Sequence, residues 1–269
     1  MPELDERPSN EIRVEETRNV LPPINRVPAH SAIVWLARGT RDMRAAPLAS
    51  LFYGFCFGAM GITVSMVFEH AYQYTSALTS GFLLLGPFLA MGLYELSRQH
   101  ERGEPMSLGR SLVVWRRNAA NIGIFALVLI VIFLVWARAS LIMFALFYTN
   151  EMPNLSGFLS QVMSLENLDF LAVYSAVGAF FAVLVFALSA VSIPMMLDRG
   201  QDAITAMLTS FAAVTRNLLP LLIWGILIAA LATLGFLTFH IGLVFFMPLI
   251  GHGTWHAYRA VVGPTTPAA

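Results

Sequence analysis

Lysine is absent from this sequence, and charged residues of any kind are scarce. Only 12% of the 269 residues are charged, whereas a soluble domain normally carries about a quarter. Hydrophobic residues make up 57% of the chain, and the mean hydropathy is +0.70. The formal net charge is zero and no basic run occurs, which argues against nucleic acid as a partner. The composition instead predicts a polytopic membrane protein, because several apolar runs approach the roughly 20 residues that span a bilayer.

The sequence also lacks the motifs of soluble enzymes. Its single cysteine, Cys56, excludes an intrachain disulfide and a cysteine-cluster metal site. It contains no phosphate-binding glycine loop, no HExxH, no nucleophile elbow and no iron–sulfur spacing. The glycines of GFCFGAMG (54–61) and GFLLLG (81–86) suit close packing between helices. We therefore expect a protein that is not an enzyme and carries no obligatory cofactor.

Six hydrophobic segments predict six transmembrane helices. They cover approximately residues 47–69, 76–97, 121 to beyond 138, 171–197, 218–233 and 237–260. Residues 1–30 are charged, contain several prolines and lack the apolar core of a signal peptide, which predicts a largely disordered cytoplasmic tail. The membrane domain is expected over residues 31–262, followed by a short C-terminal tail over residues 263–269.

The arginines predict the orientation of these spans. Fifteen of the sixteen lie before span one, between spans two and three, between spans four and five, or after span six. Arg138 is the one left over. Because positive residues accumulate on the cytoplasmic side of a membrane, both termini are predicted to be cytoplasmic. Basic residues that are all arginine are typical of a GC-rich bacterial genome, so the predicted location is the bacterial inner membrane.

A threefold repeat is indicated by two further patterns. The segments SAIVWLARGTRDMR, MSLGRSLVVWRRN and DAITAMLTSFAAVTRN each precede an odd-numbered span and predict three amphipathic helices in the inner interface, where Trp35 and Trp115 would suit the depth. Each even-numbered span carries a late proline, at Pro87, Pro194 and Pro248, which leaves the carbonyl four residues earlier without its helical donor. The predicted fold is therefore an all-α membrane protein of three hairpin repeats, each preceded by an interfacial helix.

The last span closes with PLIGHGTWHAYR, in which His252 and His256 lie one helical turn apart. This spacing suits zinc, copper or haem iron, and Glu95 or Asp198 at the ends of the matching spans would supply the missing ligands. An alternative is that His256 belongs to an aromatic and basic girdle at the membrane surface, together with Trp255, Tyr258 and Arg259. In that case, His252 would hydrogen-bond a backbone carbonyl that lacks its helical donor because of the proline. Proton handling is a third interpretation of the pair.

The remaining charged candidates have structural alternatives as well. Glu95 and Asp198 are expected to pair with Arg98 and Arg199, which follow them closely in the sequence. A second set, comprising Glu69, His70, Arg138 and His240, is predicted near the outer surface. Arg138 would either snorkel outward or pair with Glu69 inside the bundle. Residues 139–170 are predicted to extend helix three and to form a short outer helix around residues 155–163.

Four segments of the chain resemble a known bacterial family. They are GLYELSRQHERGEP, WARASLIMFALFY, SIPMMLDRGQDAITAMLTS and PLIGHGTWHAYR. These segments are similar to signature blocks of an integral membrane protein family that is classed as a domain of unknown function, and the resemblance covers roughly residues 30–262. Some members carry the label cytochrome c oxidase subunit I, but the histidines of this chain are not in places that could hold two haems and copper.

The resemblance implies a six-span inner-membrane protein and gives two hypotheses for its role. The first is an accessory or assembly component of a respiratory complex, with membrane lipids and another membrane protein complex as partners. The second is a small transporter or lipid-handling protein that uses a pocket between the three proline-broken helices. A haem- or metal-binding redox protein would depend on His252 and His256.

Overall fold

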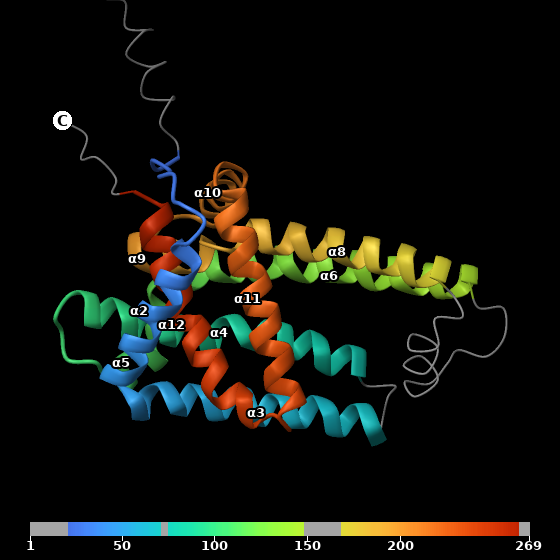
Figure 1. Cartoon of the computed structure of the whole chain (residues 1–269), viewed down its shortest axis with the longest axis horizontal. Helices are drawn as coiled ribbons and strands as arrows, with labels where there is room; N and C mark the ends of the chain where they lie inside the picture. The colour runs from blue at the N-terminus through green and yellow to red at the C-terminus, as the bar shows by residue number, and fades with distance from the viewer. Residues whose placement is uncertain (1–20, 71–74, 148–167, 264–269) are drawn as a thin grey trace, which may run out of the picture.

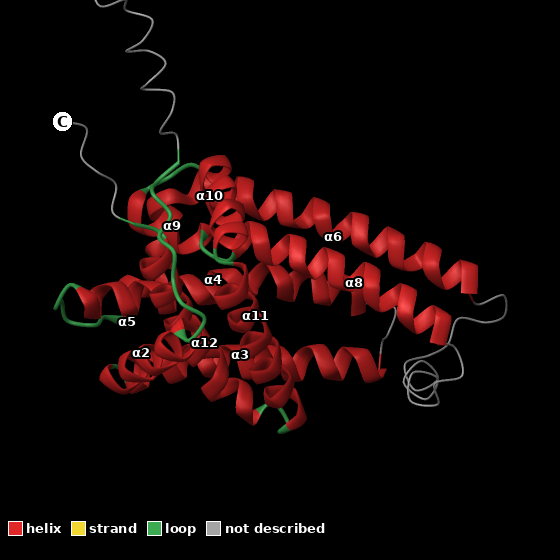
Figure 2. Ribbon diagram, turned by 45° about the horizontal axis from the view of Figure 1, so that its top comes forward, coloured by secondary structure: helices red, strands yellow, loops and turns green. Residues whose placement is uncertain are grey.

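A computed structural model describes residues 21–70, 75–147 and 168–263 of the chain. All regular elements in these ranges are helices (Figures 1 and 2). In chain order they are α2 (Ser31–Ala45), α3 (Pro47–His70), α4 (Thr75–Glu101), α5 (Leu108–Leu112), the 3₁₀ helix η2 (Val114–Asn118), α6 (Ala119–Phe147), α8 (Leu168–Ser189), α9 (Ser192–Arg199), α10 (Ala203–Arg216), α11 (Leu218–Leu237) and α12 (Ile241–Val261). The prediction of an all-α protein is confirmed.

Four helical stretches in the described ranges are long and apolar enough to cross a membrane. They are Pro47–Met66, Val114–Phe147, Leu168–Arg199 and Leu218–Leu237, and they correspond to predicted spans one, three, four and five. Helices α4 and α12 contain 27 and 21 residues, but both carry several polar side chains toward their C-terminal ends. The predicted helix around residues 155–163 lies outside the described residues.

The short helices gather at one end of the molecule. Figure 1 shows α2, α5 and α9 at this end, with α6 and α8 running side by side away from it. Helix α12 occupies the centre and packs against α2, α3, α4 and α11. The described chain begins and ends at this same end, because the backbone N–H of Gly263 donates to the carbonyl of Pro23 at 2.8 Å. Below, we call this end the polar end.

The contact between α3 and α12 depends on glycine. A Cβ atom at Gly54 would lie only 1.9 Å from the carbonyl oxygen of Val244. This is the carbonyl that lacks a helical donor because of Pro248, four residues later. Gly58 and Gly61 face α12 in the same way, so the packing role predicted for GFCFGAMG is confirmed. In contrast, a Cβ at Gly86 of GFLLLG would meet nothing within 4 Å.

The predicted fourth span is interrupted. Helix α8 ends at Ser189, and α9 begins at Ser192, whereas one helix was expected over residues 171–197. Pro194 is the third residue of α9, so it stands in a first turn, where a missing N–H costs little. The backbone N–H of Val191 donates to the side chain of Ser210 on α10 at 3.3 Å. A tertiary contact therefore stabilises the break, which single-helix periodicity could not indicate.

The connecting segments differ from the prediction in three ways. The middle interfacial segment folds as two short pieces, α5 and η2, and not as one amphipathic helix. Trp35 is not exposed on the protein surface, because it is 1% exposed and packs edge-on against Trp224 with centroids 5.8 Å apart. Trp115 is 40% exposed. Residues 21–30 belong to the predicted disordered tail, but the backbone N–H of Asn25 donates to the carbonyl of Val261 at 2.8 Å.

Candidate functional site

Three helices, α2, α4 and α12, meet at a buried carboxylate at the polar end. Asp42 of α2 is 3% exposed and accepts three hydrogen bonds. Ser97 of α4 donates at 2.6 Å, His256 of α12 through Nε2 at 2.8 Å and His100 of α4 through Nδ1 at 2.8 Å. A buried charge is costly unless it is paired and hydrogen-bonded, and these three donors satisfy Asp42.

The network continues from Ser97 to a second buried histidine. His252 is fully buried, with Nδ1 lying 2.7 Å from Ser97 Oγ and Nε2 lying 2.9 Å from Ser50 Oγ of α3. Ser97 has only one hydroxyl proton, and it goes to the Asp42 carboxylate, so Nδ1 of His252 must be the donor to Ser97. In the neutral imidazole, Nε2 then carries no hydrogen and can only accept from Ser50, whose single hydroxyl proton is shared between Nε2 and the carbonyl oxygen of Ala46, each 2.9 Å away. We call Asp42, Ser50, Ser97, His100, His252 and His256 the Asp–His centre.

The electrostatics of the Asp–His centre favour an ionised Asp42. Burial raises the pKa of this carboxyl, but the hydrogen bonds from His256, Ser97 and His100 and the charge of His256 outweigh burial. The net result is a pKa below the ordinary value of aspartate. An ionised carboxylate accepts hydrogen bonds only, which matches the three donors that point at it.

The structure therefore changes the interpretation of the closing motif. Trp255 and Tyr258 are buried at 1% and 0% exposure, so the motif is not an aromatic girdle at the membrane surface. His252 bonds two serine hydroxyls, and not a carbonyl freed by proline. In the described ranges, no group of three or more His, Cys, Asp or Glu side chains is placed to hold a metal ion. The cofactor interpretation of His252 and His256 stays a prediction.

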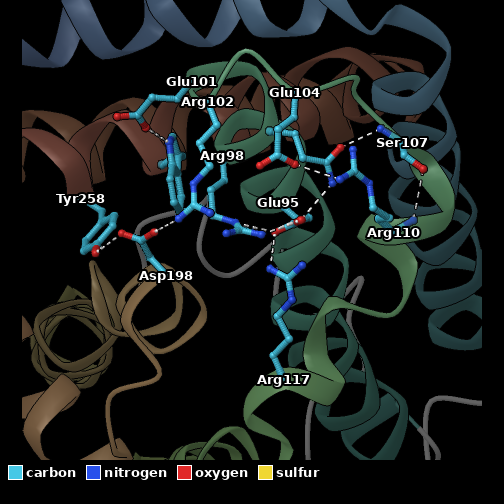
Figure 3. Close-up of polar contacts among 12 residues, drawn as sticks. Glu95, Arg98, Glu101, Arg102, Glu104, Ser107, Arg110, Arg117, Asp198 and Tyr258 are labelled. Atoms are coloured by element: carbon cyan, nitrogen blue, oxygen red, sulfur yellow. Dashed lines mark hydrogen bonds and ion pairs between the residues drawn. The ribbon is translucent and has the colours of Figure 1, made fainter.

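Glu95 and Asp198, the proposed additional ligands, belong to other networks. Glu95 is 2% exposed and forms the expected bidentate pair with Arg98, at 2.7 and 2.9 Å. Gln99 and Arg117 donate to the same carboxylate at 2.9 and 3.2 Å. Figure 3 shows Glu95 between Arg98 and Arg117. Its lone pairs are well satisfied, which is the condition for a buried ion pair to be tolerated.

Asp198 pairs differently from the prediction. Its carboxylate accepts from the hydroxyl of Tyr258 at 2.8 Å (Figure 3) and lies 3.4 Å from Arg259 and 3.6 Å from Arg102. The expected partner, Arg199, donates instead to the Tyr258 oxygen at 2.7 Å. Tyr258 and Arg259 thus join α9 to the closing motif of α12.

A large apolar cavity lies between the helices. Its volume is about 840 Å³, and its walls come mainly from α4, α6, α8 and α12. Aromatic and aliphatic side chains dominate the lining, and no charged residue is among the described residues that form it; examples are Phe57, Phe133, Trp136, Phe186 and Ile250. Gly251, which precedes His252, also lines it, so the cavity borders the Asp–His centre along α12.

The cavity lies beside the three proline positions of the even-numbered spans. Gly86, Ile193 and Met247 all line the cavity, and each directly precedes one of the prolines Pro87, Pro194 and Pro248. The pocket between proline-bearing helices therefore exists, but it is apolar. No charged residue is among the described residues of its lining, and the transporter hypothesis stays a prediction.

The outer set of candidates is only partly described. Arg138 is exposed on α6 and does not line the cavity. The side chains of Glu69 and His70 lie outside the described residues, so their pairing stays a prediction. His240 lies with Nε2 2.9 Å from the hydroxyl of Ser65 on α3.

Sequence reasoning missed most of the Asp–His centre. The predicted site residues do not include Asp42, Ser50, Ser97 or His100, although all four lie close to predicted helix ends. One signal was available, because Asp42 is the only acidic residue in a segment with three arginines, SAIVWLARGTRDMR. Asp42 follows Gly39 by three residues and Trp35 by seven, so the three residues share one helical face. Because this face is buried, the carboxylate of Asp42 needs a buried hydrogen-bonding partner.

The comparisons with known proteins concern the centre of the chain. Residues 75–198 match a family described as a predicted integral membrane protein, DUF2189, a domain of unknown function. The match includes α4, α6, α8 and α9, and therefore Glu95, Asp198 and most walls of the cavity. It is narrower than the resemblance over residues 30–262 and contains neither Asp42 nor PLIGHGTWHAYR. No curated protein and no solved structure is significantly similar to the chain.

Proposed function

We propose that this protein, a multi-pass membrane protein whose residues 75–198 form a DUF2189 domain, binds the hydrocarbon chain of a lipid between its helices. The observation that carries the proposal is the cavity of about 840 Å³ with no charged residue in its described lining. Ligand pockets typically have volumes of about 300–1,000 Å³ and mostly apolar walls. An apolar cavity in a membrane protein is accessible to lipid chains, which are the most abundant apolar molecules around it.

The shape of the cavity supports a long ligand. Phe125 and Trp136 of α6 both line it, and about 16 Å of helical rise separates them. Gly178 and Ser189 define a similar length on α8. An extended hydrocarbon chain fits such an elongated space, whereas a compact polar metabolite would lose its hydration without compensating hydrogen bonds.

The Asp–His centre supports the same proposal by stabilising one side of the cavity. Its hydrogen bonds join α2, α3, α4 and α12, and α4 and α12 supply cavity walls. The opposite wall is the antiparallel pair α6 and α8. A rigid wall facing a separate helical hairpin allows a lipid chain to enter between them.

The proposal includes the finer topology. Six spans in three hairpins, with both termini on the cytoplasmic side of a bacterial inner membrane, would place the arginine-rich polar end at the inner leaflet. The distribution of arginines supports this orientation. The role as a respiratory accessory component stays a prediction from the family resemblance.

A cavity-filling substitution tests lipid binding. The Cβ atoms of Gly178→Leu and Gly123→Leu would each meet nothing within 4 Å, but only Gly178 lines the cavity. Both changes raise helix propensity equally, so Gly123→Leu is a matched control. Native mass spectrometry of the full chain, purified in mild detergent, should show a bound lipid in the wild type and the control, and loss of that lipid in Gly178→Leu. Equal lipid content in all three proteins would refute the proposal.

A further inference from the structure

One tyrosine hydroxyl at the cavity has no partner in the protein. Tyr94 of α4 is 7% exposed and lines the cavity. Its hydroxyl has no hydrogen-bond partner among the described residues and is not one of their fully enclosed polar atoms, so it keeps some accessible surface. Two other buried tyrosines show the usual behaviour: Tyr53 bonds Ser111 at 2.8 Å, and Tyr258 bonds Asp198 at 2.8 Å. Because the hydroxyl of a buried tyrosine normally finds a partner, the exception at Tyr94 points to a ligand group.

The chemistry of that group follows from the surrounding residues. Ser189, which also lines the cavity, donates its hydroxyl proton to the carbonyl of Val185 at 2.6 Å, so it offers only lone pairs. Tyr94 can therefore donate a hydrogen bond to a ligand in the cavity, whereas Ser189 cannot. The described lining contains no charge that could balance an ionised group, and an unpaired charge would be costly there. The complement of Tyr94 is an uncharged oxygen acceptor.

The position of Tyr94 fixes where this oxygen lies. Tyr94 directly precedes Glu95 in α4, so it lies at the polar end of the cavity, together with Phe125 near the start of α6. Phe133 and Trp136 line the cavity farther along α6. A ligand with its oxygen at Tyr94 would extend its chain toward Trp136.

Resting on the proposed function, we infer that the cavity takes a long-chain lipid with an uncharged hydroxyl or carbonyl near one end, and that Tyr94 selects it by donating a hydrogen bond. The acceptor oxygen defines the ligand class, whether it belongs to a fatty alcohol or to the carbonyl of a larger lipid. Tyr94 is thus a specificity-determining residue of the lipid site.

The test uses brominated probes that quench tryptophan fluorescence from within the cavity. The full chain in lipid nanodiscs is titrated with 16-bromohexadecan-1-ol and with 1-bromohexadecane, and Trp136→Phe identifies the quenching that arises in the cavity. We expect Tyr94→Phe to weaken binding of the alcohol by about three- to tenfold, the range of one neutral hydrogen bond, and to leave binding of the alkane unchanged. Because wild type and variant are in the same bilayer, partition of each probe into lipid cancels from the comparison.

The outcomes separate this inference from the proposed function. Tyr174→Phe, outside the cavity lining, is the control and should alter neither probe. Unchanged binding of the alcohol in Tyr94→Phe would overturn the role of Tyr94, while saturable quenching that Gly178→Leu abolishes would still support chain binding. Absence of saturable quenching of Trp136 by either probe in the wild type would instead overturn the proposed function itself. Retained alkane binding in Tyr94→Phe shows that the variant is folded.

Discussion

Nδ1 of His252 on α12 lies 2.7 Å from the hydroxyl oxygen of Ser97 on α4. Because the hydroxyl of Ser97 donates its hydrogen bond to Asp42, this contact fixes which nitrogen of His252 carries hydrogen. It also joins the two helices that form one wall of the apolar cavity. The Asp–His centre can therefore be tested without knowledge of any ligand.

The first prediction concerns the tautomer of His252. We expect a neutral ring with its hydrogen on Nδ1, because Ser97 donates its only hydroxyl hydrogen to Asp42 and can therefore only accept from His252. Nitrogen-15 NMR of histidine-labelled protein distinguishes the two tautomers, and His252→Gln assigns the signal. Ser50→Ala removes the donor to Nε2 but leaves Nδ1–H in place. A signal typical of Nε2–H in the wild type would contradict the proposed hydrogen-bond directions.

The second prediction concerns the stability that Asp42 contributes. Asp42→Asn introduces an amide NH₂ facing side chains that already donate, and we expect a loss of about 1–3 kcal/mol in the free energy of unfolding. Asp202→Asn is the matched control: Asp202 is exposed and caps α10 by accepting from the N–H of Thr205 at 2.9 Å, and asparagine caps equally well. Thermal unfolding in detergent should separate the two variants, and equal melting temperatures would contradict the assigned role of Asp42.

A third prediction follows from the lowered pKa of Asp42. The folded state holds this carboxyl ionised to a lower pH than the unfolded chain does, so the unfolded chain binds more protons between the two pKa values. The stabilisation is fully present above the unfolded pKa, about 3.9 for aspartate, and is lost as the pH falls through the folded pKa. Wild-type stability should therefore decline more steeply below about pH 4 than that of Asp42→Asn. Parallel declines would show that Asp42 is not linked to folding in this way.

Local sequence patterns predicted the helices and one ion pair. The apolar runs gave α3, α6 and α11 within a few residues, and Glu95 and Arg98 are adjacent on one helical face at i, i+3. These features depend on periodicity within a single helix, which the sequence displays directly.

Contacts between distant helices could not be predicted in the same way. Asp42 and His256 are 214 positions apart, and nothing in either helix specifies which of its faces will meet the other. The pairing of Asp198 with Tyr258, and not with its neighbour Arg199, has the same origin. Adjacent residues on a helix point in different directions, so proximity in sequence was a poor guide there.

The fourth prediction concerns the close approach of α3 to α12. Gly54→Ala would place its methyl group 1.9 Å from the backbone oxygen of Val244, and backbone cannot rotate away as a flexible side chain can. We expect a loss of about 1–3 kcal/mol in the free energy of unfolding, the usual cost of overpacking, because the two helices must separate. Gly123→Ala, whose Cβ would meet nothing within 4 Å, should instead be neutral or stabilising by up to about 1 kcal/mol through helix propensity. Thermal unfolding of both variants measures the difference. A Gly54→Ala protein as stable as Gly123→Ala would mean that the carbonyl freed by Pro248 is not covered by α3.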